Sequence, residues 1–200
     1  AHMRASVDSF EVLYQSVADA LPSTPQSPEI VDLGIGTGLQ SERIYRRFPD
    51  AHITGIDLSR GMLDALRAKP WVDGRRLTLI HGSFLTLDLG EGRYDAAVSV
   101  MALHHWGLSV KQSLYQRIHR ALRSGGVFVN GDYVLSEAQQ REEHRDTASQ
   151  ALAERPHQLH LDWPLSLEQE TALLDRAGFS TVDILFQSAR ACVFCAHVKR

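Results

Sequence analysis

The sequence has little of what would point to a membrane, a secretory route or a nucleic-acid partner. Its longest apolar runs fall far short of the roughly 20 residues that a membrane-spanning helix needs, and no signal-peptide pattern opens the chain. The 21 Lys and Arg nearly balance the 24 Asp and Glu, and the cations are scattered. No DNA or RNA partner is therefore indicated. These absences predict a cytoplasmic protein with no membrane partner.

Cysteine is scarce as well, since the 200 residues include only Cys192 and Cys195. A C-x-x-C spacing can serve a metal or a redox site. Here it lies in an apolar, strand-like run, in which side chains three positions apart point to opposite faces. No second Cys/His pair at zinc-site spacing accompanies it. We therefore interpret both thiols as small buried hydrophobic groups, predict no metal site, and expect a reducing compartment.

Short apolar runs alternate with helical patterns through the chain, whose length suits one domain. This alternation is typical of an α/β fold with a parallel sheet covered on both faces. Two β-rich runs after the last helix are separated by a short turn and predict an antiparallel hairpin. The predicted strands are 30–33, 51–56, 76–81, 94–100, 126–134, 179–186 and 191–198, and the predicted helices are 39–48, 59–69, 110–122 and 167–177.

Two segments fall outside the alternation. Residues 1–28 contain a helix pattern over Ser6–Leu21 and a Pro/Ser linker, and they precede the main domain, 29–200. Residues 136–162 are polar and charged and leave the carboxyl end of a predicted strand, the edge at which such folds bind ligands. We interpret this segment as a lid, with a solvated surface helix as the alternative.

A glycine-rich turn follows the first strand, with Gly34, Gly36 and Gly38 at alternate positions. This spacing lacks the G-x-G-x-x-G offset of dinucleotide-binding turns. Asp32, two residues upstream, would repel a pyrophosphate but could pair with a cationic group. A second carboxylate, Asp57, ends the next strand, where a ribose would lie. The pattern indicates an adenosyl nucleoside that carries an amino acid rather than phosphates.

Five stretches resemble, in order, the motifs of class I S-adenosylmethionine-dependent methyltransferases: Val31–Gly38, Ile53–Leu63, Tyr94–Trp106, Leu122–Val129 and Leu173–Phe179. The resemblance implies a Rossmann-like three-layer sandwich whose seven-stranded, mostly parallel sheet ends in an antiparallel hairpin. It also implies S-adenosylmethionine as the cofactor and methyl transfer as the activity. The N-terminal helix and the 136–162 segment would then cover the acceptor side.

The same resemblance implies a role for each matching residue. The glycines and Asp32 would surround the methionine part of the cofactor, and the two oxygens of Asp57 would accept from the ribose hydroxyls. Ser83 departs from the family, which often has an acidic residue there for the adenine amino group. For Met62 and Phe84 the alternative is plain core packing. The implied cofactor set is Asp32, Gly34, Gly36, Gly38, Asp57, Leu58, Met62, Ser83, Phe84, Ser99 and Val100, of which the last two would lie near the sulfonium.

A general base is needed only if the acceptor must lose a proton, since methyl transfer depends mainly on positioning and exclusion of water. His104 and His105 are the candidates, because imidazole titrates near neutrality and both follow a predicted strand. The alternative is one packed and one surface histidine. Met101-Ala102-Leu103-His104 stands where amide and base-amine methyltransferases carry Asn-Pro-Pro-Tyr, which weighs against nucleic-acid bases and protein glutamine as targets but names no substrate. We expect a small-molecule acceptor. A non-catalytic cofactor-binding module and an NAD-dependent oxidoreductase are the alternative functions.

Overall fold

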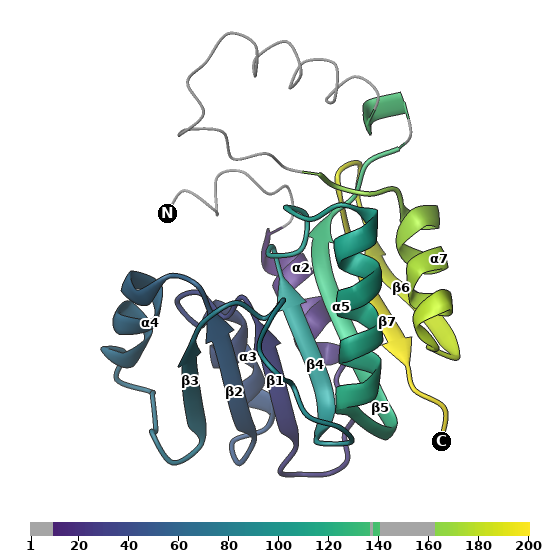
Figure 1. The fold of residues 1–200 in the computed structure, drawn as a ribbon. Helices are drawn as coiled ribbons and strands as arrows, with labels where there is room; N and C mark the ends of the chain where they lie inside the picture. The colour runs from purple at the N-terminus through teal and green to yellow at the C-terminus, as the bar shows by residue number, and fades with distance from the viewer. Residues whose placement is uncertain (1–9, 137, 141–162) are drawn as a thin grey trace, which may run out of the picture.

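The computed structural model describes residues 10–136, 138–140 and 163–200, which form one seven-stranded sheet with helices on both faces (Figure 1). The strand order is β3-β2-β1-β4-β5-β7-β6. The first five strands are parallel, whereas β7 pairs antiparallel with both β5 and β6. The strands are β1 (Glu29–Leu33), β2 (His52–Asp57), β3 (Leu77–His81), β4 (Tyr94–Val100), β5 (Leu122–Tyr133), β6 (Thr181–Gln187) and β7 (Ala191–His197).

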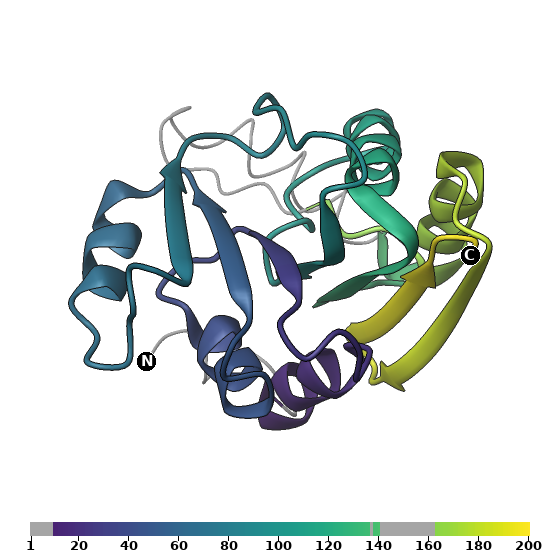
Figure 2. The ribbon, with the colours of Figure 1, turned by 90° about the horizontal axis from the view of Figure 1, so that it is seen from below.

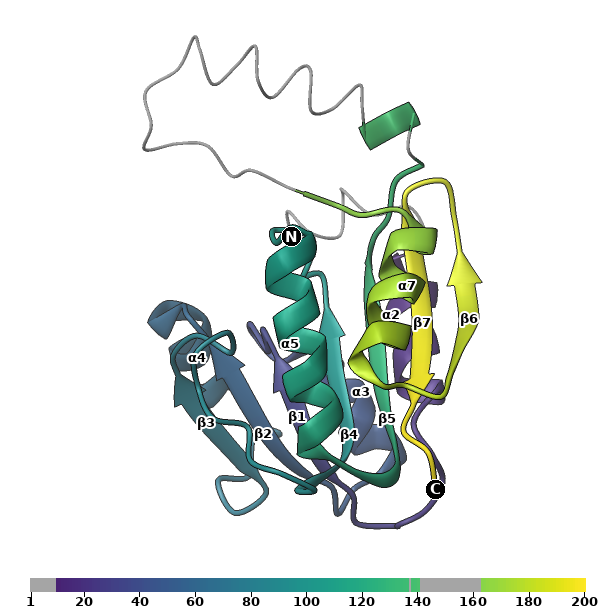
Figure 3. The ribbon, with the colours of Figure 1, turned by 45° about the vertical axis from the view of Figure 1, so that its right-hand side comes forward.

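Two helical layers sandwich the sheet, as the view from below shows (Figure 2). On one face, side chains of α2, α3 and α4 share a hydrophobic cluster with the sheet. On the other face, α5 and α7 pack side by side and share a second cluster (Figure 3). The three-layer fold predicted from the sequence is thereby confirmed. The helices are α2 (Phe10–Asp19), α3 (Leu39–Arg47), α4 (Arg60–Arg67), α5 (Leu108–Ala121) and α7 (Leu167–Ala177).

Alternation along each strand explains the two clusters, because successive side chains point to opposite faces of the sheet. In β1, Ile30 packs with α2 and α3, whereas Val31 packs in the cluster of α5 and α7. Cys195 likewise joins the first cluster. Both cysteines are free and buried, as predicted, and burial raises the pKa of each thiol to about 12.

Local capping fixes where several helices begin and end. The Ser59 hydroxyl accepts from the Met62 N–H and begins α4. Ser166 and Gln169 form a capping box at the start of α7, and Gly178 ends that helix with φ 105°. None of the helices among the described residues is long and apolar enough to cross a membrane.

The N-terminal helix α2 lies against the sheet. A Cβ on Gly131 of β5 would lie 2.9 Å from Val17 and 3.0 Å from Leu13, so α2 packs directly onto the sheet. In its described residues this helix is therefore part of a layer, and its predicted cover of the acceptor side stays a prediction. Most of the predicted lid, 136–162, lies outside the described residues.

The start of β5 differs from the sequence prediction, since it begins at Leu122 directly after α5 and not at residue 126. Leu122 pairs with Tyr94, and the register then shifts before Val127 pairs with Ala96. Gly125, with φ 76°, lies in this irregular stretch. Gly125 and Gly126 therefore lie within a strand, at an irregularity in its pairing.

Candidate functional site

The glycine turn after β1 is bound directly to the end of β2. The Gly36 N–H donates to Asp57 Oδ2 at 2.8 Å, and the Ser59 N–H donates to Asp57 Oδ1 at 2.7 Å. All three glycines of the turn have positive φ, between 55° and 79°. A Cβ on Gly34 would lie 2.5 Å from the Ala102 Cβ, so only glycine fits there. The carboxylate thus faces the turn, and each oxygen retains lone-pair capacity for a further donor.

Asp32 lies beneath this turn and is buried, with 2% of its surface exposed. Its Oδ2 accepts from the Ser41 hydroxyl of α3 at 2.9 Å. Burial raises the pKa of the Asp32 carboxyl to about 7, and the nearby charge of Asp57 adds to that rise, while the Ser41 hydrogen bond opposes it. Such a carboxyl gains from a cationic neighbour, which would stabilise its ionised form.

Two large apolar side chains beyond Asp57 are exposed. Leu58 is 59% exposed and Met62, in the first turn of α4, is 47% exposed. The exposure of Met62 excludes the alternative that its side chain packs in the core. An exposed apolar pair beside a carboxylate offers a surface on which a planar base could stack.

The loop after β3 carries Ser83 and Phe84. The Ser83 hydroxyl accepts from the Leu85 N–H at 3.2 Å. Phe84 is buried in the cluster of α5 and α7, and its ring would lie 3.8 Å from a Cβ on Gly34. Phe84 therefore supports the glycine turn from below; its predicted contact with adenine stays a prediction, as does that of Ser83.

Arg117 on α5 holds this loop in place and was not identified from the sequence. Its guanidinium donates to the carbonyls of Phe84 at 3.0 Å, Leu85 at 2.5 Å and Leu87. Three charge-assisted hydrogen bonds to one turn fix its conformation. The loop conformation therefore depends on a side chain from a distant helix.

The carboxyl end of β4 lies beside the glycine turn. The buried Ser99 hydroxyl donates to the Leu33 carbonyl at 2.9 Å and so joins β4 to the end of β1. Val100 is 7% exposed. Met101, with φ 55°, is the non-glycine residue with positive φ in the described part of the chain. Backbone strain of this kind gathers at functional sites, and here it turns the chain toward His104.

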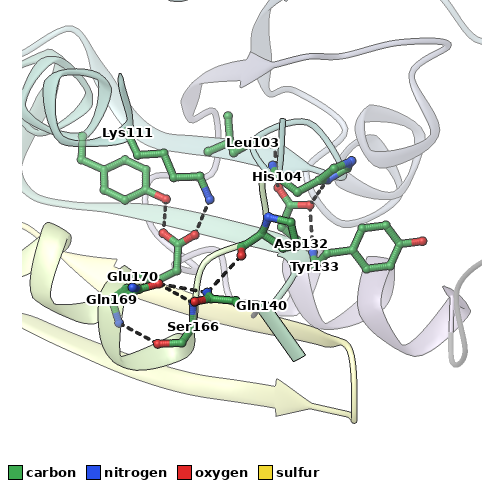
Figure 4. A network of polar contacts seen from close by, with 11 residues as sticks. Leu103, His104, Lys111, Asp132, Tyr133, Gln140, Ser166, Gln169 and Glu170 are labelled. Carbon is green, nitrogen blue, oxygen red and sulfur yellow. Dashed lines mark hydrogen bonds and ion pairs between the residues drawn. The ribbon is translucent and has the colours of Figure 1, made fainter. Parts of the chain in front are cut away.

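His104 is held by Asp132, at the end of the neighbouring strand β5 (Figure 4). Nδ1 of His104 lies 2.5 Å from Asp132 Oδ1 and must carry the proton, because a carboxylate only accepts. The N–H groups of Leu103 and His104 donate to Oδ2 at 2.8 and 3.0 Å, and that of Tyr133 donates to Oδ1 at 2.9 Å. Asp132 therefore accepts four hydrogen bonds while 2% exposed.

Burial alone would raise the pKa of the Asp132 carboxyl. The charge and hydrogen bond of His104, the charge of Lys111 and the Tyr133 N–H outweigh burial and hold that pKa below its ordinary value. Asp132 is therefore an anion at neutral pH. A buried anion that orients one nitrogen of an imidazole raises the capacity of the other nitrogen to take a proton.

Aromatic rings surround the His104 imidazole. The ring of His105 lies 4.1 Å away, centroid to centroid, and that of Tyr133 lies 5.0 Å away, edge to face. The Trp163 N–H donates to the His104 carbonyl at 2.6 Å. The segment before α7 is thus bound to the loop that carries both histidines.

Comparison with known proteins shows which proteins this chain is similar to. A profile described as a methyltransferase domain matches residues 30–126. The uncharacterised methyltransferase YdaC of Bacillus subtilis is 35% identical over 99 residues, which are 48% of this chain and 51% of the relative. Malonyl-[acyl-carrier protein] O-methyltransferase of Laribacter hongkongensis is 29% identical over 192 residues, which cover 88% of this chain and 61% of the relative. These matches support the resemblance to class I S-adenosylmethionine-dependent methyltransferases.

A solved structure agrees with this assignment at the level of the fold. Human N-acetylserotonin methyltransferase in complex with S-adenosylmethionine superposes with a TM-score of 0.70 at 20% identity, over 100% of this chain and 55% of that one. The chain spans between a third and about half of the length of the first curated relatives it matches. The matches support a methyltransferase fold and domain, and none of them identifies a substrate for this chain.

Two groups of predicted residues come together in this structure. The glycine turn, Asp32, Asp57 and the exposed Leu58–Met62 pair form one group at the carboxyl ends of β1 and β2. His104 and His105 form the other, beyond β4, and Ser99 is bound to the end of β1 between them. Sequence reasoning missed the contacts from outside the motifs, above all Arg117 and the Asp132 partner of His104, because no local pattern marks them.

Proposed function

We propose that this chain binds S-adenosylmethionine and transfers its methyl group to a small-molecule acceptor. One observation carries the proposal: the Gly36 N–H and the Asp57 carboxylate are hydrogen-bonded to each other, and exposed Leu58 and Met62 lie next to them. This arrangement suits a ribose and an adenine at one end of a glycine turn. The buried Asp32 carboxyl beneath the turn suits the cationic amino group at the other end.

The residues present fit the cofactor. The glycine turn leaves no Cβ above the end of β1; a Cβ on Gly36 would have open space around it, with its nearest contact, the Gly34 carbonyl, at 3.9 Å. Asp57 would hold the ribose, Leu58 and Met62 the adenine, and Asp32 the amino group. Bound there, the sulfonium supplies an activated methyl group. Ser99 and Val100 place the end of β4 at the same edge, where the acceptor would approach.

His104 would take the proton that the acceptor loses. Asp132 holds Nδ1–H, so Nε2 is the nitrogen that accepts. Methylation of an acceptor X–H group would release one proton, and His104 would hold that proton while S-adenosylhomocysteine is left as the other product. A positioned base of this kind contributes about 10²–10⁴-fold to a rate. A hydroxyl acceptor fits this chemistry, and the Laribacter relative is by its name an O-methyltransferase. His105 packs on the ring and would shape the acceptor side.

The test uses S-adenosylmethionine labelled in its methyl group and a panel of probes that includes a phenol, a carboxylic acid and a primary amine. We expect label transfer to at least one probe. His104→Gln should lower that rate by about 10²–10⁴-fold and leave the affinity for S-adenosylhomocysteine unchanged, because His104 lies outside the predicted cofactor set. If the protein binds the cofactor but no probe in the panel receives label, the proposed transferase activity would be contradicted.

A further inference from the structure

A fully buried ion pair lies behind His104, between the two helices of one layer. Lys111 of α5 and Glu170 of α7 are 0% and 1% exposed, and the Lys111 ammonium donates to Glu170 Oε1. The Tyr115 hydroxyl donates to Glu170 Oε2 at 2.5 Å. None of these residues belongs to a motif of the sequence analysis, and none is in the proposed cofactor set.

Stability does not account for this pair. Removing two charges from water costs several kcal/mol per ion, and hydrophobic groups of similar volume often replace such a pair without loss. Neighbouring helix positions already show this alternative, since Leu114 and Leu173 pack in an apolar cluster between the same elements. A charged pair kept in such surroundings therefore requires another role.

The position of the Lys111–Glu170 pair beside Asp132 and His104 indicates what that role is. The backbone N–H of Lys111 donates to the Gly107 carbonyl, so Lys111 lies in the first turn of α5, which follows the loop of His104. The backbone N–H of Glu170 donates to the Ser166 carbonyl, so Glu170 lies in the first turn of α7, which follows Trp163. Figure 4 shows Lys111 and Glu170 beside the Asp132–His104 pair, on the same side of the sheet. Lys111, and not Glu170, contributes to the lowered pKa of Asp132. The charge of Lys111 therefore favours the ionised form of Asp132.

We propose that Lys111 is a positioning residue for methyl transfer: its buried charge, held by Glu170 and Tyr115, keeps Asp132 ionised and disfavours a proton on His104, so that His104 is available as a base. This inference rests on the proposed function. A positive charge near an imidazole destabilises its protonated form, whereas the adjacent Asp132 stabilises that form. The balance between them sets the pH at which His104 can accept a proton.

Several titratable groups face this site in the described part of the chain. The test changes Lys111 and Tyr115 of α5 and Glu170 of α7. The groups held constant are Asp132 and Tyr133 of β5, His105 of the same loop and Tyr14 of α2.

The experiment follows the ring protons of His104 by NMR against pH, in full-length protein labelled at histidine. The chain has 10 histidines, so the signal is assigned by its loss in His104→Gln. The first variant, Lys111→Met/Tyr115→Phe/Glu170→Met, replaces the charged group with apolar side chains of similar size. The second, Lys111→Glu/Glu170→Lys, keeps the ion pair and reverses it. Asp64→Asn/Arg67→Met, which removes an exposed pair on α4, is the matched control.

We expect the His104 titration midpoint to move upward by about one pH unit in the apolar variant and further upward in the reversed variant, with no shift in the control. Urea unfolding verifies that each variant is folded. Equal midpoints in wild type and apolar variant, or a downward shift, would overturn the proposal and leave the pair as a contact that docks α7 on α5. If the reversed variant does not fold, the apolar variant decides alone.

This readout needs no cofactor and no acceptor. A failure of the proposed function appears as lost cofactor binding or absent transfer, whereas a failure of this inference appears only in the His104 titration.

Discussion

At the scale of the residue, Asp32 shows how a binding group can oppose folding. Burial moves the pKa of its carboxyl from the ordinary 3.8 to about 7. Between these two values the folded protein holds a proton that the unfolded chain has released. Stability therefore falls as the pH rises through this window, by up to about 1.4 kcal/mol per pH unit, and levels off above pH 7.

Asp32→Asn removes this dependence and keeps an oxygen that can accept from Ser41. We expect the variant to gain stability relative to wild type on going from pH 5 to pH 8, as measured by urea unfolding at both values. Asp50→Asn, at an exposed carboxyl, is the control and should show no such change. A difference between Asp32→Asn and wild type that does not vary with pH would contradict the account of Asp32.

At the scale of the element, the loop after β3 depends on α5 through Arg117. Arg117→Met keeps the length of the side chain but leaves three carbonyls without their donor. We expect a loss of about 1–3 kcal/mol in unfolding free energy and a weaker affinity for S-adenosylhomocysteine, because the loop carries Ser83 and Phe84. Arg120→Met, at an exposed position of the same helix, is the control. Lost stability with unchanged affinity would separate this loop from the cofactor site.

The elements themselves could be predicted to a large extent from the sequence. Apolar periodicity placed β1, α3 and α7 within a residue or so, because each element forms from neighbours in the chain. The start of β5 could not be predicted, since its pairing of Leu122 with Tyr94 is a contact between distant segments. The N-terminal helix was recognised as a helix, but its position on Gly131 depends on the space that a glycine leaves in the sheet.

The candidate site divides in the same way. Asp57 and the glycine turn could be predicted because strand, turn and helix follow one another directly. The partners of His104 could not, since Asp132 lies 28 residues away and the Lys111–Glu170 pair joins residues 59 apart. In the structure Asp132 orients the imidazole of His104. Side-chain pairs between separate elements leave no periodic signal in the sequence.

At the scale of the whole molecule, the parallel sheet brings the two groups of residues to one edge. Strands β1 and β2 deliver the turn and Asp57, while β4 and β5 deliver His104 and Asp132. Carboxyl ends of neighbouring parallel strands meet at the same edge, which is where open α/β sheets bind ligands. The donor and the base would therefore lie on opposite sides of one site, with the end of β4 between them.

The central claim is that Asp57 holds the cofactor, and calorimetric titration with S-adenosylhomocysteine tests it most directly. Wild type and Asp64→Ala, which removes an exposed carboxylate of α4, should bind alike. Asp57→Ala should lose measurable binding, because both the ribose acceptor and the anchor of the Gly36 N–H are gone. Thermal unfolding verifies that the variant remains folded. Normal binding by folded Asp57→Ala would contradict the site as proposed.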